Sequence, residues 1–178
     1  MAVRRWPRYN RSMSTTSFST TTVAAIAAVS GAALGSAFVA QYGFGMQPCE
    51  LCLLQRTPYQ LTLVLGLLAL IPAVPPQARR QVAALCAGLF AVNAVIAGYH
   101  AGIEYRWWKG PTACTGSVHD FDLTDLTAAL NRPGRINCED AAIRVFGISM
   151  AGGNVIACTL LALGCLWAVR RERVWDVP

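Results

Sequence analysis

Four long apolar stretches divide the chain, and none of them contains Asp, Glu, Lys or Arg. About 20 apolar residues in helical conformation are enough to cross the hydrocarbon core of a bilayer. A soluble helix of this length normally keeps a charged face, so four uniformly apolar stretches argue against a soluble domain. We therefore expect four transmembrane helices. The stretches are residues 23–44, 57–74, 82–99 and 145–169.

Composition agrees with this interpretation, because 54% of the 178 residues are hydrophobic and only 13% are charged. These fractions are unusual for a soluble domain. The predicted fold is an all-α membrane protein: a four-transmembrane-helix bundle with a short outer loop and a long outer loop containing a short surface helix. One domain, residues 23–169, is expected between cytoplasmic tails at 1–22 and 170–178.

The distribution of basic residues predicts the orientation. Nine arginines and two acidic residues fall in the two tails and the connection after the second stretch, whereas the other two connections carry six cations and seven acids. The positive-inside rule then places both termini in the cytoplasm. The net charge of +6 therefore reflects topology and not a nucleic-acid surface. The nine are Arg4, Arg5, Arg8, Arg11, Arg79, Arg80, Arg170, Arg171 and Arg173.

The first apolar stretch also resembles a secretory signal, because a basic region precedes it. Its 22 residues, 23–44, exceed the 7–15 residues of a signal core. We expect an anchor that is not cleaved.

The seven cysteines fall into two groups. Three lie inside the apolar stretches, where a thiol acts as a small packing residue. The other four map to the side opposite the arginines, which in a bacterial cell is the oxidising side, where disulfides persist. Four cysteines can pair in three ways, and proximity in the chain favours Cys49 with Cys52 and Cys114 with Cys138. The inner three are Cys86, Cys158 and Cys165.

Cys49 and Cys52 form a C-x-x-C motif, which fits half a zinc site, a structural clip or a redox pair. Zinc needs four ligands, and the four outer cysteines together offer them. However, Cys114 and Cys138 are 24 residues apart, and thiols on the oxidising side tend to be consumed as disulfides. We therefore expect no metal and favour the redox interpretation.

The surroundings of the motif support redox chemistry. In a helix beginning near Pro48, Cys49, Cys52 and Arg56 share one face at positions i, i+3 and i+7. The helix N-terminus and the arginine would stabilise a thiolate on Cys52, although Glu50 opposes this effect. Alternatively, Arg56 only anchors the helix at the lipid headgroups.

The long outer connection, about residues 101–144, is more than a linker. It opens with an aromatic and basic cluster at 105–109, which is typical of a membrane interface. Leucines at helical spacing predict a short surface helix at 121–130. A loop carrying Cys114 could reach a soluble partner. Alternatively, Cys114 and Cys138 form an inert clip.

Several short segments together resemble one known family, DsbB (disulfide bond formation protein B). The main one is the stretch from Pro48 to Arg56, in which a proline precedes C-x-x-C and an arginine follows four residues after the second cysteine. The resemblance covers roughly residues 23–169. The other segments are Gly110-Pro111-Thr112-Ala113-Cys114, Asn137-Cys138 and Phe146-Gly147-Ile148-Ser149-Met150-Ala151.

The resemblance implies a multi-pass protein of the bacterial inner membrane, with periplasmic catalytic loops, that reoxidises a periplasmic thioredoxin-fold protein of the DsbA type and passes electrons to ubiquinone or menaquinone. It implies that Cys114 forms the mixed disulfide with the partner and that Cys138 is its loop mate. Cys49 and Cys52 would be the membrane-proximal pair, with Cys52 next to the quinone and Arg56 in the quinone site.

Other residues near this site are less decisive. His100 is a candidate for quinone protonation, because imidazole titrates near neutral pH. Alternatively, it packs at the interface beside Glu104, one helical turn on. Gly153 departs from the family pattern, in which many members carry an aromatic residue. We expect Asn93 and Asn154 to form hydrogen bonds between helices.

Two other classes of function compete with a thiol oxidase. A haem or metal carrier is disfavoured, because the chain has only His100 and His119 and the second lies in a loop. A membrane assembly or structural protein would use its outer disulfides only for bracing. Substitution of Cys49 by Ser would leave such a protein functional and would inactivate an oxidase.

Overall fold

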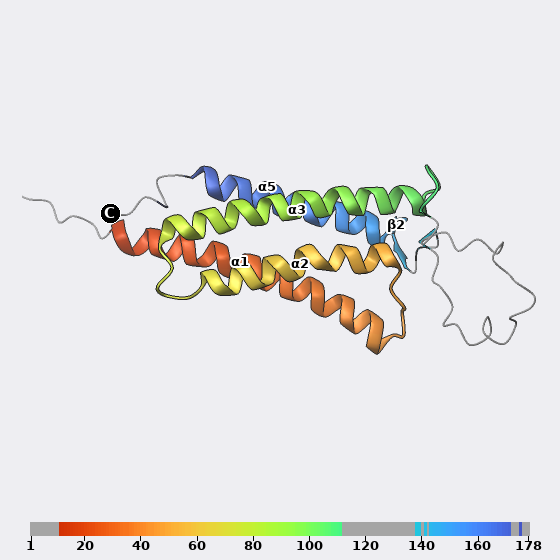
Figure 1. The fold of residues 1–178 in the computed structure, drawn as a ribbon, viewed down its shortest axis with the longest axis horizontal. Helices are drawn as coiled ribbons and strands as arrows, with labels where there is room; N and C mark the ends of the chain where they lie inside the picture. Colours follow the sequence, from red (N-terminus) through yellow and green to blue (C-terminus); the bar gives the residue numbers. More distant parts are fainter. Residues whose placement is uncertain (1–10, 112–137, 140, 142, 172–174, 176–178) are drawn as a thin grey trace, which may run out of the picture.

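The computed structural model describes residues 11–111, 138, 139, 141, 143–171 and 175. Within these residues the protein is all-helical apart from one two-stranded hairpin (Figure 1). The expected surface helix at 121–130 lies outside them, as does Cys114. The elements are α1 (Arg11–Phe38), the π-helix η1 (Val39–Gly43), α2 (Glu50–Ala69), α3 (Pro76–Glu104), β1 (Arg144–Val145), β2 (Ile148–Ser149) and α5 (Met150–Arg170).

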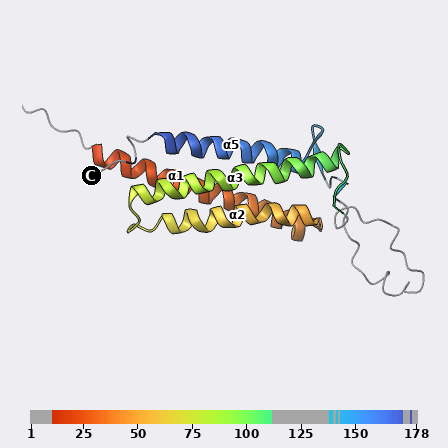
Figure 2. The ribbon, with the colours of Figure 1, turned by 45° about the horizontal axis from the view of Figure 1, so that its top comes forward.

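The four α-helices pack lengthwise into an elongated bundle, in which α5 runs along α3 and α2 packs against both α1 and α3 (Figures 1 and 2). One end of the bundle, which we call the cysteine end, carries Cys49 and Cys52 where α1 and α3 finish and α2 and α5 begin. The opposite end, which we call the arginine end, carries Arg79 and Arg80 at the start of α3. The connections therefore alternate between the two ends.

Three of the described helices are long and apolar enough to cross a membrane: Phe18–Gly43, Pro76–Glu104 and Met150–Arg170. α2 has sufficient length, but polar residues such as Gln55 and Gln60 reduce its mean hydropathy. Large apolar side chains are nevertheless exposed on the outward faces of all four helices, as expected for contact with lipid. The protein is a membrane protein.

Local contacts determine where two of the helices begin. α2 begins at Glu50, close to the start predicted near Pro48, because Cys49 is extended and its Sγ accepts a hydrogen bond from the backbone N–H of Cys52 at 3.3 Å. Residues 145–149, expected to be helical, belong to the hairpin. Its turn residue Gly147 has φ of 81°, a conformation that glycine adopts without steric cost.

Small and polar side chains bring the helices together in the bundle interior. A Cβ added at Gly66 in α2 would meet Ala27 of α1 at 3.0 Å, so the two backbones approach closely there. Nearby, Ser30 and Thr62 share a buried hydrogen bond of 2.8 Å. The three inner cysteines are buried free thiols in the same apolar core, consistent with packing roles. They are Cys86, Cys158 and Cys165.

Candidate functional site

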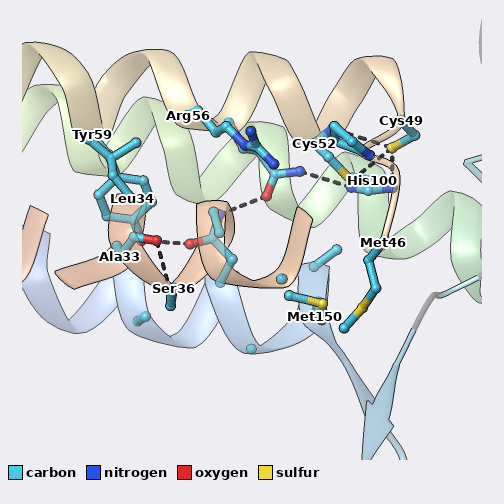
Figure 3. Close-up of a pocket in the computed structure, with 18 of the residues that line it drawn as sticks. Ala33, Leu34, Ser36, Met46, Cys49, Cys52, Arg56, Tyr59, His100 and Met150 are labelled. Atoms are coloured by element: carbon cyan, nitrogen blue, oxygen red, sulfur yellow. Dashed lines mark hydrogen bonds between the residues drawn. The ribbon is translucent and has the colours of Figure 1, made fainter. Parts of the chain in front are cut away.

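A cavity of about 380 Å³ opens between the helices at the cysteine end (Figure 3). α1 and α5 contribute mainly small or apolar side chains to its wall, whereas α2 and α3 contribute its thiols and charged groups. The cavity therefore has an apolar wall and a chemically reactive polar edge. Its lining residues include Ala33, Leu34, Ala37, Ala40, Met46, Cys49, Cys52, Gln55, Arg56, Tyr59, His100, Glu104, Met150, Gly153, Asn154 and Ala157.

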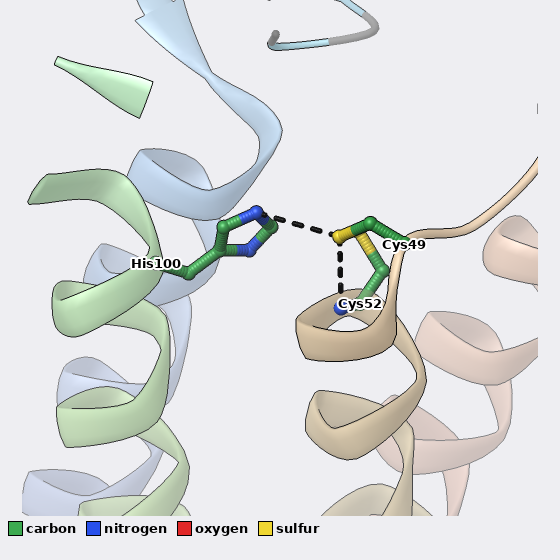
Figure 4. A group of neighbouring side chains, drawn as sticks. All are labelled: Cys49, Cys52 and His100. Atoms are coloured by element: carbon green, nitrogen blue, oxygen red, sulfur yellow. Dashed lines mark hydrogen bonds between the residues drawn. The ribbon is translucent and has the colours of Figure 1, made fainter. Parts of the chain in front are cut away.

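The two thiols of the C-x-x-C motif lie side by side next to an imidazole (Figure 4). The Sγ atoms of Cys49 and Cys52 are 2.9 Å apart, and His100 Nε2 lies 3.6 Å from Cys49 Sγ. Cys49 and His100 are buried, and Cys52 is partly buried. All three line the cavity, so the sulfur atoms face the space in which a small molecule can bind.

The position of Cys49 favours its thiolate form. Its sulfur lies at the N-terminus of α2 and accepts a backbone N–H there, and helix N-termini stabilise negative charge. The hydrogen bond between the Cys49 and Cys52 sulfur atoms and, to a lesser extent, the His100 contact lower the pKa of Cys49 to about 4, although burial acts in the opposite direction. The hydrogen bond with Cys49 and burial raise the pKa of Cys52, so these contacts favour a thiolate on Cys49 and not, as the sequence predicted, on Cys52.

Glu104 adds an acidic group at the same place. It is buried one turn after His100, and its Oε1 lies 3.9 Å from His100 Nε2. Among the described residues, no group forms a hydrogen bond with its Oε2. A buried polar atom without a partner is unusual in a folded protein and points to a ligand at this position.

Arg56 lines the cavity one turn below Cys52, as the helical spacing predicts. Its Nη1 donates to Gln41 Oε1 at 2.6 Å, and its guanidinium lies 5.4 Å from the centre of the Phe38 ring. The end of α1 and η1 therefore hold the guanidinium in place, and it presents positive charge to the cavity.

Sequence reasoning missed two residues of the site, Gln55 and Tyr59. Gln55 Nε2 donates to His100 Nδ1 at 2.8 Å, and the Tyr59 hydroxyl donates to Asn154 Oδ1 at 2.6 Å. Asn154 also donates to Gln55, so the expected interhelical hydrogen bond of this asparagine is present. The available signal was a glutamine and a tyrosine within the polar first half of an expected membrane helix.

Cys138 links the outer connection to this end of the bundle. It is buried, with 1% of its surface exposed, and it is disulfide-bonded. It packs in one apolar cluster with Cys49, Leu51 and Ile103, and Cys52 packs against this cluster. Cys138, a member of the predicted pair Cys114 and Cys138, thus lies against the pair Cys49 and Cys52. Cys114 lies outside the described residues.

The disulfide of Cys138 also bears on a zinc site made from the outer cysteines, because a bonded sulfur is not available as a thiolate ligand. Cys49, Cys52 and His100 do place one possible ligand atom each within 4.8 Å of one another. The same three atoms also suit thiolate chemistry, in which an imidazole stabilises or protonates a sulfur.

Two relatives cover most of the chain. "Uncharacterized protein RP370" of Rickettsia prowazekii (strain Madrid E) is 25% identical over 139 residues, which are 75% of this chain and 79% of that protein. "Disulfide bond formation protein B" of Stutzerimonas stutzeri (strain A1501) is 27% identical over 143 residues, which are 74% of this chain and 83% of that protein. No solved structure matches the chain significantly.

The family described as Disulfide bond formation protein DsbB matches residues 19–168. This match covers all four α-helices of the bundle from Ser19 onward and the whole cysteine end. It confirms the resemblance seen in the sequence motifs, and disulfide oxidoreductase activity follows from it. The chain therefore belongs to the DsbB family of disulfide bond formation proteins.

Proposed function

We propose that this protein is a quinone-dependent membrane thiol oxidase that reoxidises a periplasmic dithiol protein of the DsbA type. Electrons pass first to the pair Cys114 and Cys138, then to the pair Cys49 and Cys52, and finally to a quinone. The main support is the burial of the disulfide-bonded Cys138 in one cluster with Cys49, beside a cavity that both C-x-x-C thiols line.

The proposed setting is the bacterial inner membrane, crossed four times with both termini in the cytoplasm. α2 supports a fourth span, because it packs against α1 and α3 and exposes apolar residues such as Leu61 and Leu68 on its outward face. The catalytic loops would lie in the periplasm, with residues 1–22 and 170–178 as cytoplasmic tails.

The chemistry is a series of thiolate attacks on disulfides. A partner thiolate attacks Cys114 and releases the Cys138 thiolate. The partner's second thiolate then attacks the mixed disulfide, which leaves the partner oxidised and the loop pair reduced. The loop dithiol next reduces the disulfide of Cys49 and Cys52 by the same exchange, so two electrons and two protons reach the inner pair.

The cavity suits a quinone as the final acceptor. Its volume of about 380 Å³ is typical of a small-molecule site, and the small side chains of α1 and α5 leave room for an apolar ring. Cys52, Arg56 and His100 are the residues expected to hold the ring, and beside them lies Glu104 Oε2, which has no hydrogen-bond partner in the described part of the chain. A bound ubiquinone or menaquinone would take two electrons and two protons from the dithiol and leave as quinol.

The proposal is tested by mixing purified protein with a reduced DsbA-type protein and a soluble quinone. Thiol loss and quinone reduction are followed together, and the expected stoichiometry is two thiols lost for each quinone reduced. A protein with Cys49→Ser serves as the inactive control. Absence of coupled turnover with several such partners and both quinone classes would rule out the proposed function, and full activity of the control would favour a bracing role for the cysteines.

A further inference from the structure

A single line of hydrogen bonds runs from the bundle interior to Cys49. Tyr59 in α2 donates to Asn154 Oδ1 of α5 at 2.6 Å, and Asn154 Nδ2 donates to Gln55 Oε1 at 2.6 Å. Gln55 Nε2 donates to His100 Nδ1 of α3 at 2.8 Å, and His100 Nε2 lies 3.6 Å from Cys49 Sγ. Three helices contribute, and each side chain donates to the next.

The orientation of the Gln55 amide is fixed from two sides. Its Nε2 also donates to the carbonyl of Leu51 at 3.2 Å, while its Oε1 accepts from Asn154. If the Gln55 amide were rotated by half a turn, the Leu51 carbonyl would lose this donor. The Gln55 NH₂ group would then face the NH₂ group of Asn154. An amide NH₂ donates and does not accept, so His100 Nδ1 is the acceptor. In a neutral imidazole the proton then lies on Nε2, the atom next to Cys49.

We propose that Gln55, supported by Asn154 and Tyr59, holds His100 in the Nε2–H tautomer, which donates a hydrogen bond to the Cys49 thiolate. These three are positioning residues, because they act on sulfur only through His100. A neutral N–H donor stabilises the thiolate of the reduced pair without taking its negative charge away. The tautomer of His100 does not depend on the proposed function. Any effect of this tautomer on quinone-linked turnover does rest on the proposed function.

Other groups that face His100 and Cys49 are few. α2 contributes Cys52 and Arg56, and α3 contributes Glu104. Cys138 of the outer segment is disulfide-bonded and does not titrate. The residues of α1 and α5 that line the cavity carry no charge. Gln55 acts on Nδ1, and Glu104, whose Oε1 lies 3.9 Å from Nε2, favours a proton on the same Nε2 atom.

The tautomer is measured by ¹⁵N NMR of the full-length reduced protein labelled at histidine. The chain has two histidines, and a His119→Gln variant assigns the signals. We expect His100 to show an unprotonated Nδ1 and a protonated Nε2, and Gln55→Met to weaken this preference, with Glu104 still favouring a proton on Nε2. A protonated Nδ1 in the unsubstituted protein would overturn the proposal. Cys165→Ala is the matched control, because Cys165 is a buried free thiol of α5 that lies outside this line of hydrogen bonds.

The consequence for sulfur is measured by the pH dependence of Cys49 alkylation in the reduced protein, read by peptide mass spectrometry. Loss of a hydrogen bond to a charged group is expected to move the midpoint upward by about one pH unit in Gln55→Met. A smaller upward shift is expected in Tyr59→Phe, which keeps its shape and provides a second variant if Gln55→Met does not fold. Midpoints unchanged in both variants would overturn the proposal. Neither measurement uses a quinone or a partner, so its failure is distinct from failure of the proposed oxidase.

Discussion

The two ends of the bundle bury polar groups in different ways. At the arginine end, the buried Arg79 is fully engaged: Nε donates to the Ala69 carbonyl at 3.0 Å, and Nη1 donates to Thr20 Oγ1 at 2.7 Å. At the cysteine end, Glu104 Oε2 has no hydrogen-bond partner among the described residues, and a cavity adjoins it. Burial of a polar side chain therefore does not identify a functional site by itself. A buried polar atom that lacks a hydrogen-bond partner beside a cavity is the more informative feature.

The arginines at the start of α3 have a structural role in addition to setting topology. Arg79 contacts the connection after α2 through the carbonyls of Ala69 and Ile71. Arg80 Nε donates to the Val169 carbonyl at the end of α5, where the helix leaves carbonyls unpaired and favours a cation. The arginine end thus connects helix termini through hydrogen bonds, whereas the cysteine end holds thiols beside a cavity.

The largest expected loss of activity comes from substitutions at the cysteine end. Cys49→Ser or Cys52→Ser should reduce quinone-dependent oxidation of the partner to the level without protein, because a hydroxyl cannot complete the disulfide exchange. Thermal unfolding should change little. Cys165→Ala, a buried free thiol remote from the cavity lining, is the matched control and should keep its activity. Full activity of the Cys49→Ser protein would contradict the assignment of the chemistry to the cysteine end.

The pH dependence of the reduced site should also distinguish it from an ordinary thiol. Because the pKa of Cys49 is lowered to about 4, its thiolate should persist from high pH down to about pH 4 and should disappear below it. At pH 6 an ordinary thiol with a pKa of 9.0 is only about 0.1% thiolate. Ultraviolet thiolate absorbance of reduced protein, with Cys49→Ser as the blank, provides the measurement. A midpoint near pH 9 would contradict the account.

Filling the cavity should weaken quinone use. Gly153 lines the cavity, and a Cβ added there meets nothing within 4 Å, so Gly153→Phe should place a ring in the space left for the acceptor. The KM for quinone should rise about tenfold, which corresponds to about 1.4 kcal/mol. Gly164→Phe is a matched control on the same helix, with open space but outside the cavity. Equal KM values in the two variants would show that the cavity is not the acceptor site.

A substitution at the arginine end should change the stability of the protein and not its activity. Arg79→Met removes the hydrogen bonds that Arg79 donates to the Ala69 carbonyl and the Thr20 hydroxyl, which should lower the free energy of unfolding by about 1–3 kcal/mol. Detergent-solubilised protein can be compared by thermal unfolding, and turnover can be normalised to folded protein. A loss of normalised turnover with unchanged stability would reverse the roles that we assign to the two ends.

The smallest effect is expected at the inner thiols. Cys86→Ala removes one buried sulfur from the apolar core, at a cost of about 1 kcal/mol or less, and should leave turnover unchanged. The same unfolding and turnover assays apply. If this variant lost activity, the inner thiols would have a redox role in addition to packing.

Much of the architecture could be predicted from periodicity and charge. The apolar stretches correspond to α1, α2, α3 and α5, although the lengths differ. α3 extends from Pro76 to Glu104, because polar residues near helix ends are compatible with helix where they find partners. α2 begins at Glu50, because the Cys49 sulfur caps it, a role that sequence patterns rarely assign to cysteine. The number of spans and the orientation stay predictions.

The site was predictable only in part. The spacing of Cys49, Cys52 and Arg56 placed them on one face of a helix, and all three line the cavity. The line through Gln55 and Tyr59 could not be predicted, because it depends on how α3 and α5 pack against α2, which no local pattern specifies. The loop roles of Cys114 and Cys138 stay predictions as well.

The central claim is that the two cysteine pairs form one relay at the cysteine end. Disulfide mapping of the Cys52→Ser protein, purified without reductant, tests it most directly, because Cys49 then lacks its normal partner. The account predicts a mass-spectrometric peptide that joins Cys49 to Cys138 or Cys114, since Cys138 packs in the same cluster as Cys49. A fully free Cys49 beside an intact disulfide between Cys114 and Cys138 would contradict exchange between the pairs.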